Sequence, residues 1–191
     1  MSTLKVLQNS IVMDNGTTSG KVLRKLKEKE ATIKSFNCGD ADLNDFLFNE
    51  APLYSEALLA VTYIYEDANN VLAYFSLAND RISLTDFENK TKFNRFRKRR
   101  FVNEKRLKSY PAVKICRLGV SEECKGAGVG TGLLNFIKKL FLATNKTGCR
   151  FLTVDAYYEA IPFYIRNGFI PLEEEDKDEH TRLLFYDLKD E

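Results

Sequence analysis

The chain has 191 residues, a formal net charge of +2 and 44% hydrophobic residues, a composition typical of a globular protein with a sizeable core. It shows neither a signal-peptide pattern nor an uncharged apolar run long enough to span a membrane, so we predict a cytoplasmic protein without a membrane partner. The four cysteines form no CxxC pair and the only histidine, His180, lies in an acidic run, which argues against a zinc site and favours free thiols.

The first half of the chain predicts an extension, a strand, a helix and a hairpin. Residues 1–20 show weak periodicity and several turn formers, so we predict an N-terminal extension before a single domain over residues 21–191. The segment KEATIKSF (29–36) predicts a strand, and after the turn NCGD either Asp40 or Asp42 can cap a helix. The segments LLAVTYIYED and VLAYFSLANDRISL, joined by DANN, are rich in β-branched and aromatic residues and predict a hairpin.

The charges are unevenly distributed. Residues 90–108 hold ten lysine or arginine residues and one acidic residue, whereas residues 173–179 are nearly all acidic. The basic stretch has no clear periodicity, and Pro111 ends it. A basic segment of this kind can bind phosphates, or it can be a solvated helix that packs its phenylalanines inward.

The second half alternates strands with helices. AVKICRLGV (112–120) predicts a strand, and after a glycine-rich loop the apolar spacing predicts a helix carrying Val129, Leu133, Leu134, Ile137, Leu140 and Phe141. CRFLTVDA is nearly continuous in apolar residues and predicts a central strand covered on both faces. AIPFYIRNG predicts a short helix with Pro162 in its first turn and Gly168 at its end, and TRLLFYDL predicts a last strand. This order of elements indicates an α/β or α+β fold.

The loop SEECKGAGVGTG places four glycines at alternate positions between a strand and a helix. Such a loop binds anions, because backbone N–H groups and the helix dipole point at the ligand. The dinucleotide spacing G-x-G-x-x-G fails, since Thr131 and Leu133 stand at the two possible sixth positions. A Walker loop fails as well, because no lysine follows these glycines.

Three blocks in order resemble the GCN5-related N-acetyltransferases, the GNAT family. KGAGVG (125–130) is similar to the family's acyl-CoA loop, with Lys125 where the family has glutamine or arginine. ICRLGV is similar to the family's fourth strand, and VDAYYEAIPFYIRNGFIP is similar to the family's pattern after the fifth strand. The resemblance covers residues 112–171 and implies one domain with a mixed, mostly antiparallel sheet, flanked by helices, whose fourth and fifth strands splay apart.

The resemblance also implies acetyl-CoA as co-substrate, whereas the spacing of cysteine and histidine already led us to expect no metal. Backbone groups of Leu118 and Val120 are expected to pair with the pantetheine arm, and a backbone N–H of Leu118 or Gly119 to stabilise the oxyanion. The amides expected to hold the pyrophosphate belong to Lys125, Gly126, Ala127, Gly128, Val129, Gly130 and Thr131.

Tyr164 is the expected general acid, because the family commonly uses the tyrosine of its FY motif. A tyrosine with an ordinary pKa of about 10 is protonated at neutral pH and can donate to the leaving thiolate. Tyr157 stands where the family often has asparagine, so the side-chain contact to CoA at this position is not carried over. The fourth strand holds no aspartate or glutamate, so the sequence indicates no general base.

The acceptor is left open by the sequence. The N-terminal half resembles the subgroup that contains acetylating toxins, which act on the amino group of aminoacyl-tRNA. Residues 90–108 could then contact tRNA through their cations, with Phe93, Phe96 and Phe101 stacking on bases. We expect direct attack by a primary amine in a ternary complex; the alternatives are the tRNA reaction and a non-catalytic acyl-CoA-binding regulator. The sequence does not indicate the oligomeric state either; a homodimer is one possibility.

Overall fold

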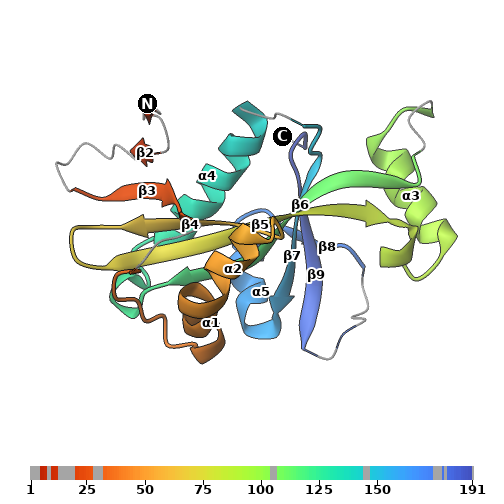
Figure 1. Ribbon diagram of the computed structural model, residues 1–191. Helices are drawn as coiled ribbons and strands as arrows, with labels where there is room; N and C mark the ends of the chain where they lie inside the picture. The colour runs from red at the N-terminus through yellow and green to blue at the C-terminus, as the bar shows by residue number, and fades with distance from the viewer. Residues whose placement is uncertain are drawn as a thin grey trace. The chain divides into compact units, whose positions relative to one another are not determined.

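The computed structural model describes residues 5–7, 10–12, 20–27, 32–103, 107–143, 147–173, 178 and 180–190. The chain divides into two compact units, Met1–Ala78 with Cys116–Asn135 and Asn79–Ile115 with Phe136–Glu191. Strands β5 (Val71–Ser83) and β6 (Ser109–Val120) and helix α4 (Val129–Ala143) each supply residues to both units (Figure 1).

The first unit holds an antiparallel arrangement of strands in the order β1-β2-β3-β4-β5-β6. Its first members are β1 (Lys5–Leu7), β2 (Ser10–Val12), β3 (Val22–Lys25) and β4 (Val61–Glu66). The predicted hairpin is confirmed: β4 and β5 pair antiparallel, and the Asp67 carboxylate accepts hydrogen bonds from the turn amides of Asn69 and Asn70. An aspartate that binds amides two and three residues ahead is what closes this turn.

Helices α1 (Ala41–Asp45) and α2 (Ala51–Glu56), with a π-helical turn Phe46–Glu50 between them, cover the apolar side of the first unit. The predicted helix cap is Asp40, whose carboxylate accepts a hydrogen bond of 3.0 Å from the Leu43 N–H. The core beneath these helices consists of Leu26, Phe36, Cys38, Phe46, Leu47, Ala51, Ile64, Val71 and Tyr74. The helix predicted after the NCGD turn is therefore confirmed, and Phe46 and Leu47 from this segment are buried in the core.

The second unit has strand order β5-β6-β7-β9-β8. Strand β7 (Phe151–Tyr157) pairs in parallel with β6 through Ala112–Lys114, and antiparallel with β9 (Thr181–Asp187) along its whole length. The short strand β8 (Ile170–Pro171) pairs with β9. The first four residues of β7 are buried, as predicted for a central strand. The predicted α/β class with a mixed sheet, flanked by helices, is confirmed.

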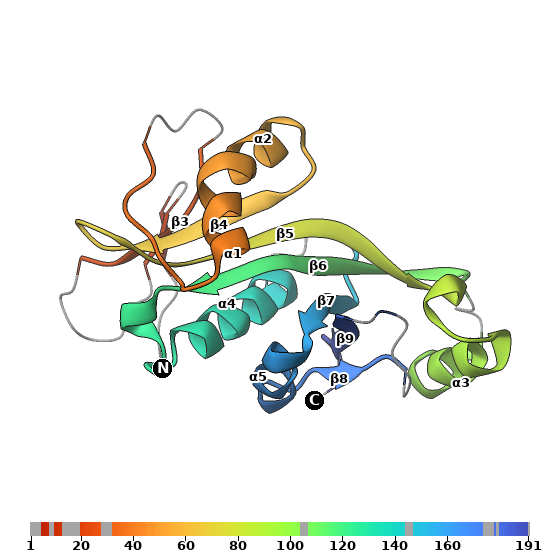
Figure 2. The ribbon, with the colours of Figure 1, turned by 90° about the horizontal axis from the view of Figure 1, so that it is seen from below.

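The basic stretch forms helix α3 (Lys90–Arg100), beyond the ends of β5 and β6 in the second unit (Figure 2). Asn89 caps it by accepting from the amides of Thr91 and Lys92. Phe93 and Phe96 are buried at 4% and 7% exposure in a cluster with Phe87, Phe151 and Phe185. The suggestion that these two phenylalanines stack on bases is therefore wrong, because core packing already occupies their ring faces.

Phe101 follows the end of α3 and is equally engaged. Its ring stacks on Tyr110 with centroids 4.1 Å apart and an interplanar angle of 2°. The Arg150 guanidinium lies 5.2 Å from its centroid on the ring. Because both contacts come from its own unit, Phe101 serves packing as well.

The sequence misplaced one strand near the N-terminus. The strand predicted at 29–36 is wrong for its described part, 32–36, where only Ser35 forms an isolated bridge with Asn70. The strand lies instead at Val22–Lys25, where Leu23 is fully buried. Strands β1 and β2 pair in turn beside it, so part of the predicted N-terminal extension carries sheet structure.

Three further features bear on the function. No helix in the described part of the chain is long and apolar enough to cross a membrane. Cys38, Cys116, Cys124 and Cys149 all carry free thiols. Among the described residues, no cluster of histidine, cysteine, aspartate and glutamate side chains is arranged to hold a metal ion.

Candidate active site

The glycine-rich loop lies in the first unit and joins β6 to α4. After β6 ends at Val120, a short 3₁₀ turn Glu122–Cys124 leads to Lys125, and α4 begins at Val129. Gly126 and Gly128 have φ angles of +79° and +78°, which L side chains rarely adopt. A Cβ at either position would meet no protein atom within 4 Å. Backbone conformation, and not crowding within the chain, therefore requires glycine at these two positions.

The backbone amides of this loop divide into two groups. The Lys125 N–H donates to the Glu122 carbonyl and the Ala127 N–H to the Cys124 carbonyl, each at 3.3 Å. These two bonds hold the shape of the turn. The first-turn N–H groups of α4 have no acceptor within a helix, and together with Gly126 and Gly128 they are the amides best placed to receive an anion. Residues Lys125–Gly128 are exposed to solvent.

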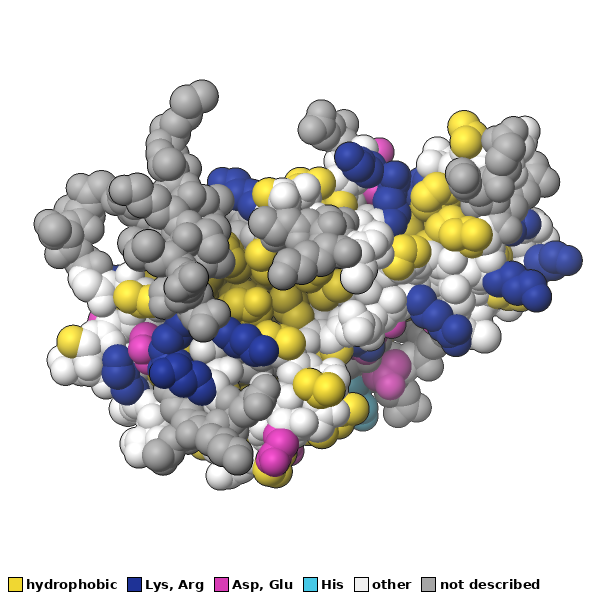
Figure 3. Space-filling view, turned by 45° about the horizontal axis from the view of Figure 1, so that its top comes forward, with side chains coloured by type: hydrophobic (Ala, Val, Ile, Leu, Met, Phe, Trp, Pro, Cys, Tyr) yellow, Lys and Arg dark blue, Asp and Glu magenta, His cyan; other side chains and the backbone are white. Residues whose placement is uncertain are grey.

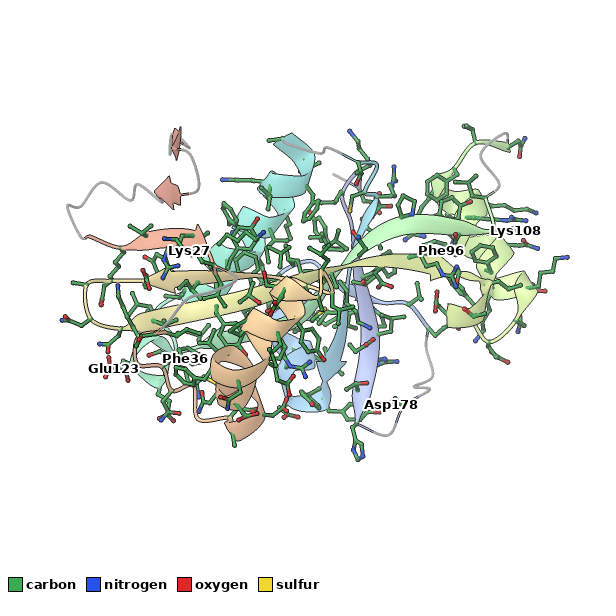
Figure 4. The ribbon with its side chains drawn as sticks, in the orientation of Figure 1. Lys27, Phe36, Phe96, Lys108, Glu123 and Asp178 are labelled. Atoms are coloured by element: carbon green, nitrogen blue, oxygen red, sulfur yellow. The ribbon has the colours of Figure 1, made fainter. Side chains whose placement is uncertain are left out.

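A second turn supports the loop from the side. Gly39, in the predicted NCGD turn, has φ +79°, and a Cβ there would lie 2.7 Å from the Glu122 carboxylate and 3.3 Å from Lys125 Nζ. The Glu122 N–H donates to the Asn37 carbonyl at 3.0 Å. Phe36 and Glu123 lie at the same end of the first unit in Figure 4. The turn at residues 37–40 therefore fixes the entry to the glycine loop, a role the sequence did not reveal.

One hydrogen bond at the end of β6 indicates which of its backbone groups face β5. The Ser121 N–H donates to the Leu72 carbonyl of β5 at 2.9 Å. Because backbone groups alternate along a strand, the N–H and C=O of Gly119 also turn toward β5, while those of Leu118 and Val120 turn to the opposite edge. Between the two oxyanion candidates, this parity favours the Leu118 N–H over that of Gly119.

Gly119 is required by aromatic packing. A Cβ on it would lie 2.7 Å from Tyr74 Cε1 and 3.1 Å from Phe36 Cζ. Tyr74 cannot yield easily, since it is fully buried and its hydroxyl donates to the Leu43 carbonyl at 2.7 Å. The missing side chain thus lets the buried rings of Tyr74 and Phe36 pack directly against the backbone of β6.

We therefore expect Gly119→Ala to lower the free energy of unfolding by about 1–3 kcal/mol, the usual cost of overpacking a core. Urea unfolding followed by circular dichroism measures it. Gly148→Ala is the matched control, because a Cβ there meets nothing within 4 Å. Equal stability of the two variants would contradict a packing requirement at Gly119.

Arg117 lies on β6 beside helix α1 and the π-helical turn. Its guanidinium is 5.1 Å from the centroid of Phe46 and 3.7 Å from the Asp42 carboxylate. It also donates to the Cys116 carbonyl at 3.0 Å. The face of β6 that carries Gly119 is thus filled by Arg117, Tyr74 and Phe36, whereas Leu118 and Val120 point their side chains to the other face.

Tyr164 lies in the second unit, on the short helix α5 (Ile161–Arg166). Pro162 occupies the first turn of α5 and Gly168, with φ +81°, follows its end, as predicted. The Tyr164 side chain is 6% exposed and packs edge-on against Phe163 and Phe169, with centroids 5.2 and 5.4 Å away. Burial raises the pKa of its hydroxyl above the ordinary value, so the group stays protonated at neutral pH.

The neighbouring tyrosines have different surroundings. Tyr157 and Tyr158 are 49% and 43% exposed, and the Tyr158 hydroxyl donates to the Asp178 carbonyl at 3.3 Å. Helix α5 is tied to α4 within the second unit, because Lys138 donates to the Asn167 carbonyl at 2.6 Å and lies 4.0 Å from the Tyr186 ring centroid. Of these three tyrosines, Tyr164 is the one whose side chain is buried.

Known proteins resemble this chain in sequence and in fold. A family model described as an acetyltransferase (GNAT) domain matches residues 88–189, and no curated protein matches. A tyrosine-to-phenylalanine variant of KacT is 23% identical with a TM-score of 0.71, covering 89% of this chain and 96% of that chain. AtaT complexed with acetyl-methionyl-tRNAfMet is 24% identical with a TM-score of 0.67, covering 88% and 95%.

A structure described as a bacterial toxin has a TM-score of 0.72 at 15% identity, covering 90% of this chain and 92% of that chain. At these identities the likeness establishes the fold. The family match extends over more than half of the 191 residues and includes both the glycine loop and Tyr164. The chain therefore belongs to the family of acetyltransferases that carry the GNAT domain.

Proposed function

We propose that this protein transfers the acetyl group of acetyl-CoA to a primary amine by direct attack in a ternary complex. The proposal rests chiefly on the glycine loop, whose positive-φ glycines and open surroundings at the start of a helix suit a diphosphate. Membership of the GNAT family gives the reaction class. Acetyl-CoA supplies an activated acetyl group. The residues of this chain bind it and donate one proton to the leaving thiolate.

The amides of Gly126, Gly128 and Val129–Thr131 are the proposed diphosphate ligands. Lys125 and Ala127 are assigned a supporting role, because their N–H groups already close the turn. The backbone of Leu118 and Val120 is proposed to pair with the pantetheine amides, as an additional strand would. The proposed diphosphate ligands are therefore fewer than the seven residues expected from the sequence, because the Lys125 and Ala127 N–H groups already donate within the turn.

The chemistry needs one oxyanion donor and one acid. The unprotonated amine attacks the thioester carbonyl, a C–N bond forms, and the oxygen gains negative charge opposite the proposed Leu118 N–H donor. The C–S bond then breaks and the departing thiolate takes the phenolic proton of Tyr164. The proton lost by the amine passes to water, since β6 from Cys116 to Val120 offers no carboxylate. Tyr164 is reprotonated from solvent before the next turnover.

The raised pKa of Tyr164 predicts the pH dependence of acetyl transfer. With an α-amine acceptor, kcat/KM should rise as the amine loses its proton near pH 8 and should then stay level to pH 10. A tyrosine of ordinary pKa would ionise near pH 10 and produce a falling limb. A pH–rate profile from pH 6 to 10, taken on the folded protein, measures the difference; a falling limb below pH 10 would contradict the assignment.

A second candidate acceptor is the amino group of aminoacyl-tRNA. Exposed cations on α3 favour it, because phosphates attract them regardless of sequence. An α-amine also suits a site without a general base, since its pKa is near 8 and that of lysine is near 10.4. AtaT, which shares the fold, was solved with acetyl-methionyl-tRNAfMet. The tRNA reaction is therefore kept beside a small-molecule or protein amine.

The test is transfer of labelled acetyl from acetyl-CoA to charged bulk tRNA, beside polyamines, amino acids and lysine peptides. Label on aminoacyl-tRNA would establish the toxin-like reaction, and label only on a simple amine or peptide would exclude it. Binding of acetyl-CoA without any transfer would contradict the proposal and favour a non-catalytic regulator. Light scattering of the same preparation tests whether the protein is a homodimer.

A further inference from the structure

A pocket of about 550 Å³ lies within the second unit, between helix α3 on one side and strands β8 and β9 on the other. Its lining comes from parts of the chain far apart in sequence, so no segment alone reveals it. The space-filling view shows lysine and arginine side chains at this end of the molecule, over α3 (Figure 3). All residues that line the pocket belong to the second unit, and none of them belongs to the glycine loop.

The lining carries a strong excess of positive charge. Among the residues that the structure describes, five cations and one carboxylate, that of Glu173, line the pocket; the cations are Lys92, Arg95, Arg99, Arg100 and Arg182. Such a concentration of one sign in a concave surface raises the local concentration of anions.

Three of these cations are held by the protein itself. Lys92 forms ion pairs with Glu88 at 2.5 Å and with Glu173 at 3.0 Å. Arg100 lies 3.2 Å from the Asp187 carboxylate and 4.4 Å from the centroid of the Phe96 ring. Arg182 donates to the Glu173 carbonyl at 3.4 Å. These contacts fix the walls of the pocket.

Arg95 and Arg99 differ from the other three. Both are exposed, and their guanidinium groups make no ion pair or hydrogen bond within the described residues, which leave out the acidic positions 174–177. They stand four residues apart on α3, so they are neighbours on one helix face. Like charges at this spacing destabilise a helix slightly, and an anion bound by both would reverse that effect.

The wall opposite α3 has an apolar part beside the charged side chains of Glu173 and Arg182. Ile170, Pro171 and Leu172 contribute to it, and Ile170 is 46% exposed although it is a large hydrophobic residue. Phe87 and Phe185 line the pocket as well. A simple inorganic anion would leave this wall in contact with water. The combination suits a ligand with both a phosphate and a flat, largely apolar ring system.

We propose that this α3–β9 pocket binds a nucleotide, with Arg95 and Arg99 as the ligands of its phosphate. The ring system lies against the wall formed by residues 170–172. The nucleotide is either free or one unit of a polynucleotide, since both present the same phosphate and base. The site does not depend on the proposed acetyl transfer, because its residues take no part in that chemistry.

The test is calorimetric titration of the full chain with 5′-AMP, with adenosine and with inorganic phosphate, without acetyl-CoA. We expect Arg95→Gln/Arg99→Gln to weaken AMP binding at least about tenfold, through loss of two charge-assisted contacts. Lys90→Gln/Lys98→Gln is the matched control: it removes the same charge from exposed positions of the same helix, outside this pocket. A 5′-phosphorylated RNA hexamer, followed by fluorescence anisotropy, forms the second arm.

AMP binding that adenosine lacks, and that only the arginine variant weakens, supports a free nucleotide. Binding of the hexamer alone, with the same dependence on the two arginines, supports a polynucleotide as the source. If both double variants weakened binding equally, the general positive charge of the helix would explain the binding, and the proposed site would be overturned. Absence of binding in both arms, or inorganic phosphate binding as tightly as AMP, would overturn it too. Acetyl transfer to a simple amine should stay unchanged in both variants, which separates this proposal from the proposed function.

Discussion

Tyr164→Phe is expected to lower kcat for acetyl transfer by about a hundredfold or more, the usual contribution of a positioned general acid. The KM for acetyl-CoA should stay within about twofold, because the phenolic hydroxyl acts on the leaving thiolate and not on the bound diphosphate. Steady-state kinetics with a fixed amine measures both constants. The ring itself remains, so its packing against Phe163 and Phe169 is kept.

The control for this prediction is Tyr158→Phe. Tyr158 is 43% exposed and lies six residues earlier, so it tests whether loss of any phenol in this region reduces activity. Thermal unfolding of both variants separates a chemical defect from a structural one. A Tyr164→Phe protein with near-normal kcat would remove Tyr164 from the mechanism, and a variant that loses activity together with stability would indicate a packing role.

The sequence predicted best those elements whose signal is local. Strand β7 was recognised because a nearly continuous apolar run of this length is typical of a strand covered on both faces, and its first four residues are indeed buried. The ends of α5 were recognised because Pro162 and Gly168 restrict the backbone directly. In each case the preference of a few neighbouring residues agrees with the tertiary structure.

The sequence failed where a distant partner decides the structure. The apolar residues of 32–36 predicted a strand, but Phe36 packs into the core beside Tyr74 without regular sheet pairing. The basic stretch shows no clear helical pattern of apolar residues. Arg97 and Arg100 lie over the buried rings of Phe93 and Phe96, so charged residues stand on the same side of the helix as the core residues.

The candidate site shows the same division. The need for glycine at 126 and 128 could be recognised from the sequence, since a positive φ depends on the residue's own backbone and is rarely adopted by other residues. The requirement for glycine at 119 could not, because it comes from Tyr74 and Phe36, both more than 40 residues away in sequence. The choice of Leu118 over Gly119 as oxyanion donor likewise needed the bond from Ser121 to Leu72.

Replacing both Gly126 and Gly128 by alanine is expected to raise the KM for acetyl-CoA at least about tenfold. Alanine in the left-handed region costs about 1–2 kcal/mol per residue, so the loop would relax and turn its amides away. Each tenfold change in affinity corresponds to about 1.4 kcal/mol, so even partial relaxation is measurable. At saturating acetyl-CoA, kcat should fall less, because the proposed acid and oxyanion donor lie outside the loop.

Gly132→Ala is the matched control for this pair. Gly132 lies inside α4 without a positive φ, and a Cβ there meets nothing within 4 Å. That substitution should stabilise the helix by about 0.5–1 kcal/mol and leave the KM unchanged. Because a Cβ on Gly126 or Gly128 also has free space within the chain, any loss of acetyl-CoA affinity must come from the altered backbone or from crowding of the ligand itself. An unchanged KM in the double variant would place the diphosphate elsewhere, whereas a raised KM beside a normal control ties it to these amides.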